Sequence, residues 1–274
     1  MKISLVIAPP EAQPSAFVVF RDRLDASVRK ARALGYDGVE LALAVASDVE
    51  IPFMRRLLAN EGMRLAAVST GRVFAEQRVW LTHPDRSVRG RAVEILKGLI
   101  DVAVELDAPR VNIGRVRGIV HEGESVETAQ ARFFEGIGAC AEYATPHGIN
   151  IVLEPVNRYE TNYINSVLPD GIGVIHRLGH PNVKLMPDVF HMNIEDASIA
   201  DSLVAAGSLV GYVHLADSNR WAPGQGHTDF HAIVRALAKI GYDDDVAVEI
   251  LPYPSADEAA TQAIRYLRAL IPRE

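Results

Sequence analysis

The chain has 274 residues, 49% of them hydrophobic, which is enough to bury the core of one large α/β domain or of two small ones. Lys and Arg number 28 and Asp and Glu 35, which gives a formal net charge of −7 and excludes a general attraction to nucleic acid or to an anionic membrane. No apolar run approaches the ~20 residues that cross a bilayer.

The apolar residues 3–8 run directly into Pro9, Pro10 and Glu11, which favours a first strand over a signal peptide. Cys140 is the only cysteine, so a disulfide within the chain is excluded. A single cysteine fits a reducing compartment, and we expect a cytoplasmic protein. The helical pattern around Cys140 predicts a core position rather than a reactive thiol.

Short apolar runs alternate with longer amphipathic segments from end to end, without a linker or low-complexity stretch. The apolar runs predict strands at 3–7, 38–41, 64–68, 110–113, 150–153, 183–186, 209–213 and 246–248. The amphipathic segments predict helices at 22–34, 52–60, 87–106, 126–147, 167–178, 198–206, 230–240 and 257–270. Several helices are followed by a glycine that suits a left-handed C-cap: Gly35, Gly62, Gly148, Gly179 and Gly241.

This alternation predicts an α/β fold, a (β/α)8 TIM barrel that forms a single domain over residues 1–274. An open doubly wound sheet is the alternative, but it would need a glycine-rich phosphate-binding turn after an early strand. The chain contains neither Gly-x-Gly-x-x-Gly nor a Walker-type Gly-Lys-Ser/Thr motif.

Four of the predicted strands are each followed by a residue that can bind a metal: Glu154, Asp188, His214 and Glu249. In a barrel these residues end strands five to eight at the carboxyl end of the sheet, where such barrels bind their ligands. A charged group that follows a fully apolar strand needs a partner, and a shared cation provides one. Three carboxylates and one imidazole favour Mn²⁺, with Mg²⁺ or Co²⁺ as alternatives, over a structural zinc site.

Three further polar residues follow these strands within six positions and are expected to orient a substrate: His191, Arg220 and Glu160. Two of them also have a simpler explanation. His191 can cap the following helix, and Arg220 can pair with Asp217.

Several segments resemble the ketose 3-epimerases of the xylose isomerase-like barrel superfamily: 154–160 (EPVNRYE), 188–195 (DVFHMNIE), 214–226 and the strand that ends at Glu249. Others extend the resemblance over nearly the whole chain and are most similar to members that act on 5-keto-L-gluconate: 81–84 (LTHP), 113–118 (IGRVRG) and 218–224 (SNRWAPG). The resemblance implies an isomerase that inverts C3 of a keto sugar or keto sugar acid, with 5-keto-L-gluconate and D-tagaturonate as the pair. It also implies a homodimer or homotetramer.

The resemblance implies that the four strand-end residues are ligands of a divalent metal. It also implies that Glu154 and Glu249 are the two catalytic bases. The chemistry agrees, because a metal that holds the carbonyl and the neighbouring hydroxyl allows deprotonation to a cis-enediolate, and inversion needs an acid on each face of the sugar. The resemblance further implies that His191 and Arg220 bind substrate oxygens, and that Glu160 braces the site.

The segment 226–229 (GHTD) departs from the ketose epimerases that act on neutral sugars. In multi-metal relatives the equivalent positions help to hold additional metal, so one interpretation is a second ion bound by His191, His227 and Asp229. The other is that His227 contacts the substrate or orders its loop, while Asp229 caps the helix that begins near 230.

Three arginines follow the predicted third and fourth strands and would lie at the same end of the barrel: Arg72, Arg115 and Arg117. A guanidinium binds a carboxylate or phosphate through two hydrogen bonds, so an acidic sugar or a sugar phosphate is a candidate substrate. Solvated loop charge is the alternative for each of them.

The sequence is also compatible with other functions. An aldose–ketose isomerase would share the metal and the enediolate, and would differ in the carbon that receives the proton. A multi-metal apurinic-site endonuclease predicts a basic surface and additional histidines, where this chain has 69–71 (STG) and 112–114 (NIG). A non-catalytic sugar-binding barrel gives no reason for two opposed carboxylates beside a metal.

Overall fold

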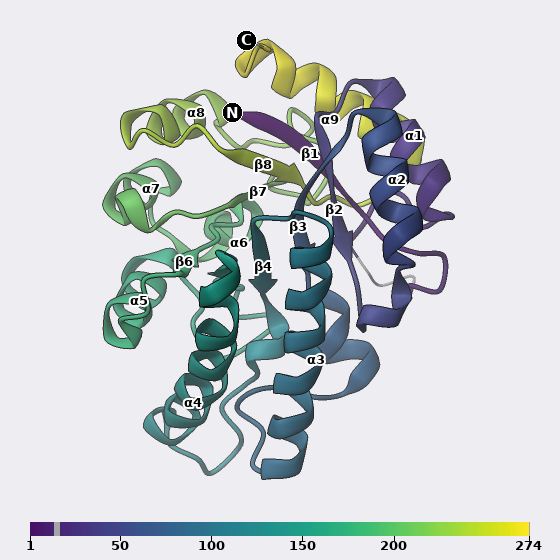
Figure 1. The fold of residues 1–274 in the computed structure, drawn as a ribbon. Coiled ribbons are helices and arrows are strands. Elements are labelled where there is room, and N and C mark those ends of the chain that lie inside the picture. Colours follow the sequence, from purple (N-terminus) through teal and green to yellow (C-terminus); the bar gives the residue numbers. More distant parts are fainter. Residues whose placement is uncertain (14–16, 274) are drawn as a thin grey trace.

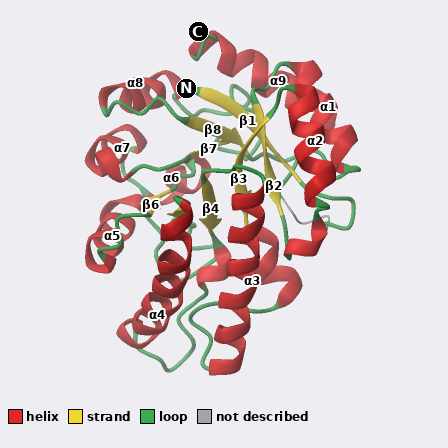
Figure 2. Ribbon diagram, in the orientation of Figure 1, coloured by secondary structure: helices red, strands yellow, loops and turns green. Residues whose placement is uncertain are grey.

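The computed structural model describes residues 1–13 and 17–273, and its strands form one eight-stranded parallel sheet. The strands are β1 (Lys2–Ile7), β2 (Gly38–Ala42), β3 (Arg64–Ser69), β4 (Arg110–Ile113), β5 (Asn150–Leu153), β6 (Val183–Leu185), β7 (Val213–Leu215) and β8 (Asp245–Val248). The helices are α1 (Leu24–Leu34), α2 (Ile51–Glu61), α3 (Arg86–Glu105), α4 (Val126–Ala144), α5 (Ile172–Leu178), α6 (Val189–Glu195), α7 (Ile199–Ala206), α8 (Phe230–Lys239) and α9 (Ala256–Leu270). Figures 1 and 2 show the helices arranged around the strands.

The sheet closes into a barrel between β6 and β7, where the regular ladder stops. The strands follow the order β6-β5-β4-β3-β2-β1-β8-β7. Across the remaining gap, the backbone N–H groups of Gly211 and His214 donate to the carbonyl oxygens of Leu185 and Pro187, at 2.8 and 2.9 Å. The predicted TIM barrel is therefore confirmed.

Apolar side chains fill two layers, one between the strands and the helices and one inside the barrel. The inner layer contains several alanines, among them Ala66, Ala67 and Ala247. Because alanine is small, these positions leave room for larger polar side chains near the barrel axis. Among the described residues, no helix has the length and hydropathy needed to cross a membrane.

The structure corrects several predicted boundaries. The strand predicted at 209–213 is wrong in position, because Gly207–Leu209 is a 3-10 turn and β7 begins only at Val213. His214 consequently lies within the strand rather than after it. The helix predicted at 167–178 is interrupted by the non-helical backbone of Leu168, and α5 begins at Ile172. The short helix α6, after Asp188, was not among the predicted segments.

The predicted glycine C-caps are confirmed. Gly35, which ends α1, has a φ of 98°, a left-handed conformation that a side chain disfavours. The other four predicted glycines also have positive φ. These tight helix ends return the chain to the sheet within a few residues.

Candidate metal centre and active site

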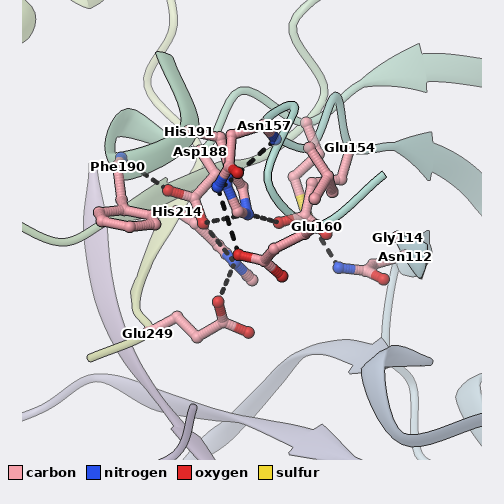
Figure 3. Close-up of polar contacts among 12 residues, drawn as sticks. Asn112, Gly114, Glu154, Asn157, Glu160, Asp188, Phe190, His191, His214 and Glu249 are labelled. Atoms are coloured by element: carbon pink, nitrogen blue, oxygen red, sulfur yellow. Dashed lines mark hydrogen bonds and ion pairs between the residues drawn. The ribbon is translucent and has the colours of Figure 1, made fainter. Parts of the chain in front are cut away.

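Glu154, Asp188, His214 and Glu249 converge at one end of the barrel (Figure 3), each brought there by a different strand, β5 to β8. Each residue offers one ligand atom, and these four atoms all lie within 4.8 Å of one another. Within the described part of the chain, no other group of His, Cys, Asp or Glu side chains is arranged in this way. The parallel sheet explains the convergence, because the carboxyl ends of its strands meet at one rim.

Two buried atoms in this cluster have no hydrogen-bond partner among the described residues. Asp188 is the N-cap of α6: its Oδ1 accepts a hydrogen bond of 2.8 Å from the backbone N–H of Phe190, and its Oδ2 has no partner. His214 Nδ1 also has none, although the side chain is fully buried. Unsatisfied buried polar atoms are rare because they are costly. A divalent cation would satisfy both atoms, and a donor set of three carboxylates and one imidazole fits Mn²⁺ or Mg²⁺.

His214 is held from the opposite side by Glu40 of β2. His214 Nε2 lies 2.9 Å from Glu40 Oε2, and both side chains are fully buried. The other ring nitrogen, Nδ1, lies 4.0 Å from Asp188 Oδ2 and 3.8 Å from Glu249 Oε2. Burial would lower the pKa of His214, but the negative charges of Glu40 and Glu249 outweigh it and raise the pKa well above its usual value.

The environments of Glu154 and Glu249 shift their pKa values in opposite directions. Burial, together with the negative charge of Glu249, raises the pKa of Glu154 well above its usual range. Burial would also raise the pKa of Glu249, but the positive charge of Arg220 and the contact with His214 lower it to about 2. In the metal-free site, therefore, one carboxyl tends to hold a proton while the other stays ionised.

Arg220 joins the metal cluster to the rest of the cavity. Its guanidinium donates to Glu249 Oε2 at 2.5 Å and to Glu160 Oε1 at 3.2 Å. The guanidinium carbon lies 3.7 Å from the ring centroid of Phe17 and 4.7 Å from that of Phe190. The alternative that Arg220 pairs with Asp217 is wrong, because Asp217 accepts backbone N–H groups of its own loop instead.

His191 presents one ring nitrogen to the cluster. Its Nδ1 lies 2.7 Å from Asn157 Nδ2, which can only donate, so Nδ1 accepts and the proton of a neutral ring is on Nε2. Nε2 lies 3.7 Å from Glu154 Oε1 and 3.8 Å from Asp188 Oδ2. Burial, reinforced by the charge of Arg220, holds the pKa of His191 well below its usual value. A neutral N–H donor therefore points at the space beside the carboxylates.

A cavity that is open to solvent lies beside the cluster. Glu154, Glu249, His191, Arg220 and Glu160 all line it, as the sequence predicts.

Two of the three predicted arginines, Arg72 and Arg115, also line this cavity, but only one of them is free of a carboxylate partner among the described residues. The guanidinium of Arg72 is paired with Glu76, at 2.8 Å, and with Asp48, at 3.0 Å. Arg115 lies over the ring of Phe74, 4.8 Å from its centroid, and forms no ion pair within the described residues; its buried Nε has no hydrogen-bond partner among them. Arg115 is therefore the arginine that can receive an anionic group.

The expectation that Arg117 lies at the cavity is wrong. Its side chain is fully buried and donates to the backbone carbonyls of Gly114, Glu154, Tyr163 and Ile164. These contacts tie the loops after β4 and β5 together. Because its N–H groups already donate to these carbonyls, Arg117 stabilises the loops and does not reach the cavity.

The structure does not bring together the residues proposed for a second metal. His227 is exposed and its Nδ1 lies 2.9 Å from Ser218 Oγ, a contact that orders the loop. Asp229 is the N-cap of α8 and accepts a hydrogen bond of 2.9 Å from the backbone N–H of Ala232. Neither residue belongs to the group that could hold a metal or to the cavity wall. The second metal ion and the contact of His227 with substrate are therefore both wrong, and the two residues have the structural roles that were the alternative.

Sequence reasoning missed two residues of this site. Glu40 lies inside β2, and a carboxylate within an apolar strand was a signal that we did not use. Phe17, which covers Arg220, lies in the loop after β1 and carries no recognisable sequence signal.

Comparison with known proteins shows that the chain is similar over most of its length to a family of TIM barrels and to several sugar epimerases. Residues 28–270 match the family described as "Xylose isomerase-like TIM barrel". The chain is 31% identical over 233 residues to the D-psicose 3-epimerase of Agrobacterium fabrum, covering 81% of this chain and 77% of that protein. It is 32% identical over 234 residues to the L-ribulose 3-epimerase of Methylomonas sp., covering 82% and 78%. The crystal structure of a D-allulose 3-epimerase from Methylomonas sp. superposes with a TM-score of 0.83, at 25% identity and with 98% of both chains covered.

Proposed function

The chain belongs to the xylose isomerase-like TIM-barrel family and, within it, to the ketose 3-epimerases. We propose that it inverts C3 of a keto sugar or keto sugar acid, with an acid of the 5-keto-L-gluconate type as the first candidate. The isomerase class follows from the relatives. The observation that carries the proposed mechanism is the pair Glu154 and Glu249 in one cluster that could hold a metal, beside a solvent-open cavity that both residues line.

We propose Glu154, Asp188, His214 and Glu249 as the metal ligands. When bound there, a divalent cation such as Mn²⁺ would polarise the carbonyl and neighbouring hydroxyl oxygens of the ketose and stabilise an enediolate. The orphaned Asp188 Oδ2 and His214 Nδ1 support this assignment, since both atoms face the other ligands.

The proton transfers are assigned to the two glutamates. One of them, Glu154 or Glu249, takes the proton from C3, and the other returns a proton to C3 from the opposite face of the enediolate. They follow β5 and β8, with β6 and β7 between them, so that they approach a substrate from different sides of the rim. His191 would donate its Nε2–H to a substrate oxygen, and Arg220 would do the same while holding Glu249 ionised.

The acidic substrate is proposed from the cavity wall. Arg115 is the lining arginine without a carboxylate partner among the described residues. A neutral ketose would leave this charge without an anionic partner, whereas a keto sugar acid would provide one.

The reaction can be tested by proton NMR in D₂O with the Mn²⁺-loaded chain and 5-keto-L-gluconate, D-tagaturonate, D-tagatose and D-fructose in separate samples. We expect deuterium at C3 and formation of the C3 epimer, fastest with the two acids and abolished by a chelator. Deuterium at C1 would instead establish an aldose–ketose isomerase. Absence of exchange in every sample would overturn the proposed function.

Substitution of Arg115 tests the acidic substrate. Because a hydrogen bond to a charged group contributes about 1.5–3 kcal/mol, we expect Arg115→Met to raise KM for the keto acid by roughly 10- to 100-fold. Turnover of D-tagatose should change little. Arg177→Met is the matched control, because Arg177 is exposed and stacks on Phe134 at 5.8 Å from its centroid. An equal loss for acidic and neutral substrates would contradict the role of Arg115.

A further inference from the structure

Glu40 is a buried carboxylate that the proposed reaction does not use. It lies in the middle of β2, is 0% exposed, and pairs in the sheet with Val6 and Ala67 of the apolar inner layer. Removing a carboxylate from water is unfavourable unless a partner compensates. Its Oε1 has no partner among the described residues, so the contact of Oε2 with His214 is the interaction that must account for this residue.

The contact with Glu40 determines which nitrogen of His214 is available to a metal. A neutral imidazole has one N–H donor and one acceptor nitrogen. When the ring is neutral, as it is when it binds a metal, Nε2–H donates a hydrogen bond to Glu40 Oε2 at 2.9 Å, which leaves the lone pair on Nδ1. The ring of Tyr212 packs edge-on against the imidazole with 5.5 Å between the ring centroids, and restricts its rotation.

We propose that Glu40 is a positioning residue that turns Nδ1 of His214 toward the metal and raises its basicity. Nδ1 lies 3.8 Å from Glu249 Oε2 and 4.0 Å from Asp188 Oδ2. Ligands ~2.1 Å from an octahedral ion are ~3 Å apart when adjacent and ~4 Å apart when opposite, so these spacings suit a shared cation. A carboxylate behind a metal-binding histidine commonly strengthens its binding. This inference rests on the metal site of the proposed function, but not on the identity of the substrate.

The test is Mn²⁺ affinity of the full chain, measured by electron paramagnetic resonance of the free ion. We expect Glu40→Leu, which removes the acceptor at similar size, to raise the Kd for Mn²⁺ by about 10- to 100-fold. Glu40→Gln should lose less, because its amide oxygen can accept the same N–H. The matched control is Asp245→Asn: Asp245 is also 0% exposed, but it begins β8 at the opposite end of the barrel. Its Kd should stay within twofold of the parent value.

A second readout separates positioning from a merely structural role. In the chain labelled with ¹⁵N-histidine and loaded with diamagnetic Mg²⁺, long-range ¹H–¹⁵N correlations should show His214 protonated at Nε2 and not at Nδ1. Protonation at Nδ1 would overturn the inference, and this readout needs no variant should Glu40→Leu fail to fold.

The two proposals fail differently. Mn²⁺ binding by Glu40→Leu with a Kd within twofold of the parent would overturn the role of Glu40 alone. A parent chain that binds no Mn²⁺ would overturn the proposed metal site and, with it, this inference.

Discussion

Replacing Glu154 or Glu249 by glutamine is expected to lower the rate of epimerisation by about 10²- to 10⁴-fold, the usual contribution of a positioned general acid or base. Glutamine keeps an oxygen that can bind the metal, but it cannot exchange the C3 proton. Each variant should therefore retain one of the two proton transfers. We expect Glu154→Gln to exchange deuterium into one C3 epimer without forming the other, and Glu249→Gln to do so with the opposite epimer.

These outcomes can be followed by proton NMR in D₂O starting from each epimer separately, with Mn²⁺ affinity measured in parallel. Glu160→Gln is a useful comparison, because Glu160 also lines the cavity and contacts Arg220 but is not one of the clustered ligands. It should show a smaller loss and no preference for one epimer in exchange. Full turnover by either Glu154→Gln or Glu249→Gln would exclude the two-base mechanism.

Arg220→Met is expected to have the second large effect, on both stability and activity. Arg220 is 4% exposed and donates to Glu249 and Glu160. Removing one partner from a buried ion pair costs about 3–5 kcal/mol. For a chain of this size, ~1 kcal/mol lowers Tm by about 2–4 °C, so we expect the metal-free variant to melt roughly 6–20 °C below the parent.

The loss of Tm in Arg220→Met should depend on pH because of Glu249. Burial would raise the pKa of Glu249 above 4.5, but the charge of Arg220 outweighs burial and lowers the pKa to about 2. A carboxyl with a lowered pKa stabilises the fold above its unfolded value, and that stability is lost as pH falls toward the folded value. The difference in Tm between parent and Arg220→Met should thus be largest near pH 7 and should shrink below about pH 4.5. Activity should fall as well, since Glu249 would no longer be held ionised.

Arg220→Lys tests whether charge alone is sufficient. Lysine carries the charge but lacks the planar fork that contacts two carboxylates and stacks between Phe17 and Phe190. We expect an intermediate Tm and low activity. A deficit in Tm that is independent of pH would show that packing between the two rings, and not the pairing with Glu249, accounts for the stability.

The sequence predicted the barrel because the parallel strands of this sheet are short, largely buried and mostly apolar runs, and the helices between them each have one apolar face. It failed at β7 for the same reason. Residues 209–212 are as apolar as a strand, yet Leu209 ends a 3-10 turn and the residues after it form a connection that leads to β7 at Val213. An apolar pattern indicates that residues are buried, but not that they form a strand. Here the buried segment begins before the strand does.

The carboxyl ends of the strands also made the metal-binding residues recognisable. A charged residue placed directly after an apolar run, as Glu154 and Glu249 are, has few partners nearby in the chain. The shared direction of parallel strands requires such residues to meet. Local sequence was sufficient here because strand direction alone determines which end of the sheet a residue occupies.

The order of strands and helices, the end of the barrel that carries polar residues, and four side chains that meet there could all be predicted from local sequence patterns. Which arginine is available to a ligand could not be predicted in this way. Arg115 and Arg117 are two residues apart, but Arg115 lines the cavity whereas Arg117 is surrounded by backbone carbonyls. The contact between Glu40 and His214, which are 174 positions apart, is seen only in the folded chain. Both depend on side-chain direction and on contacts between distant strands, which local patterns of hydrophobicity and charge do not contain.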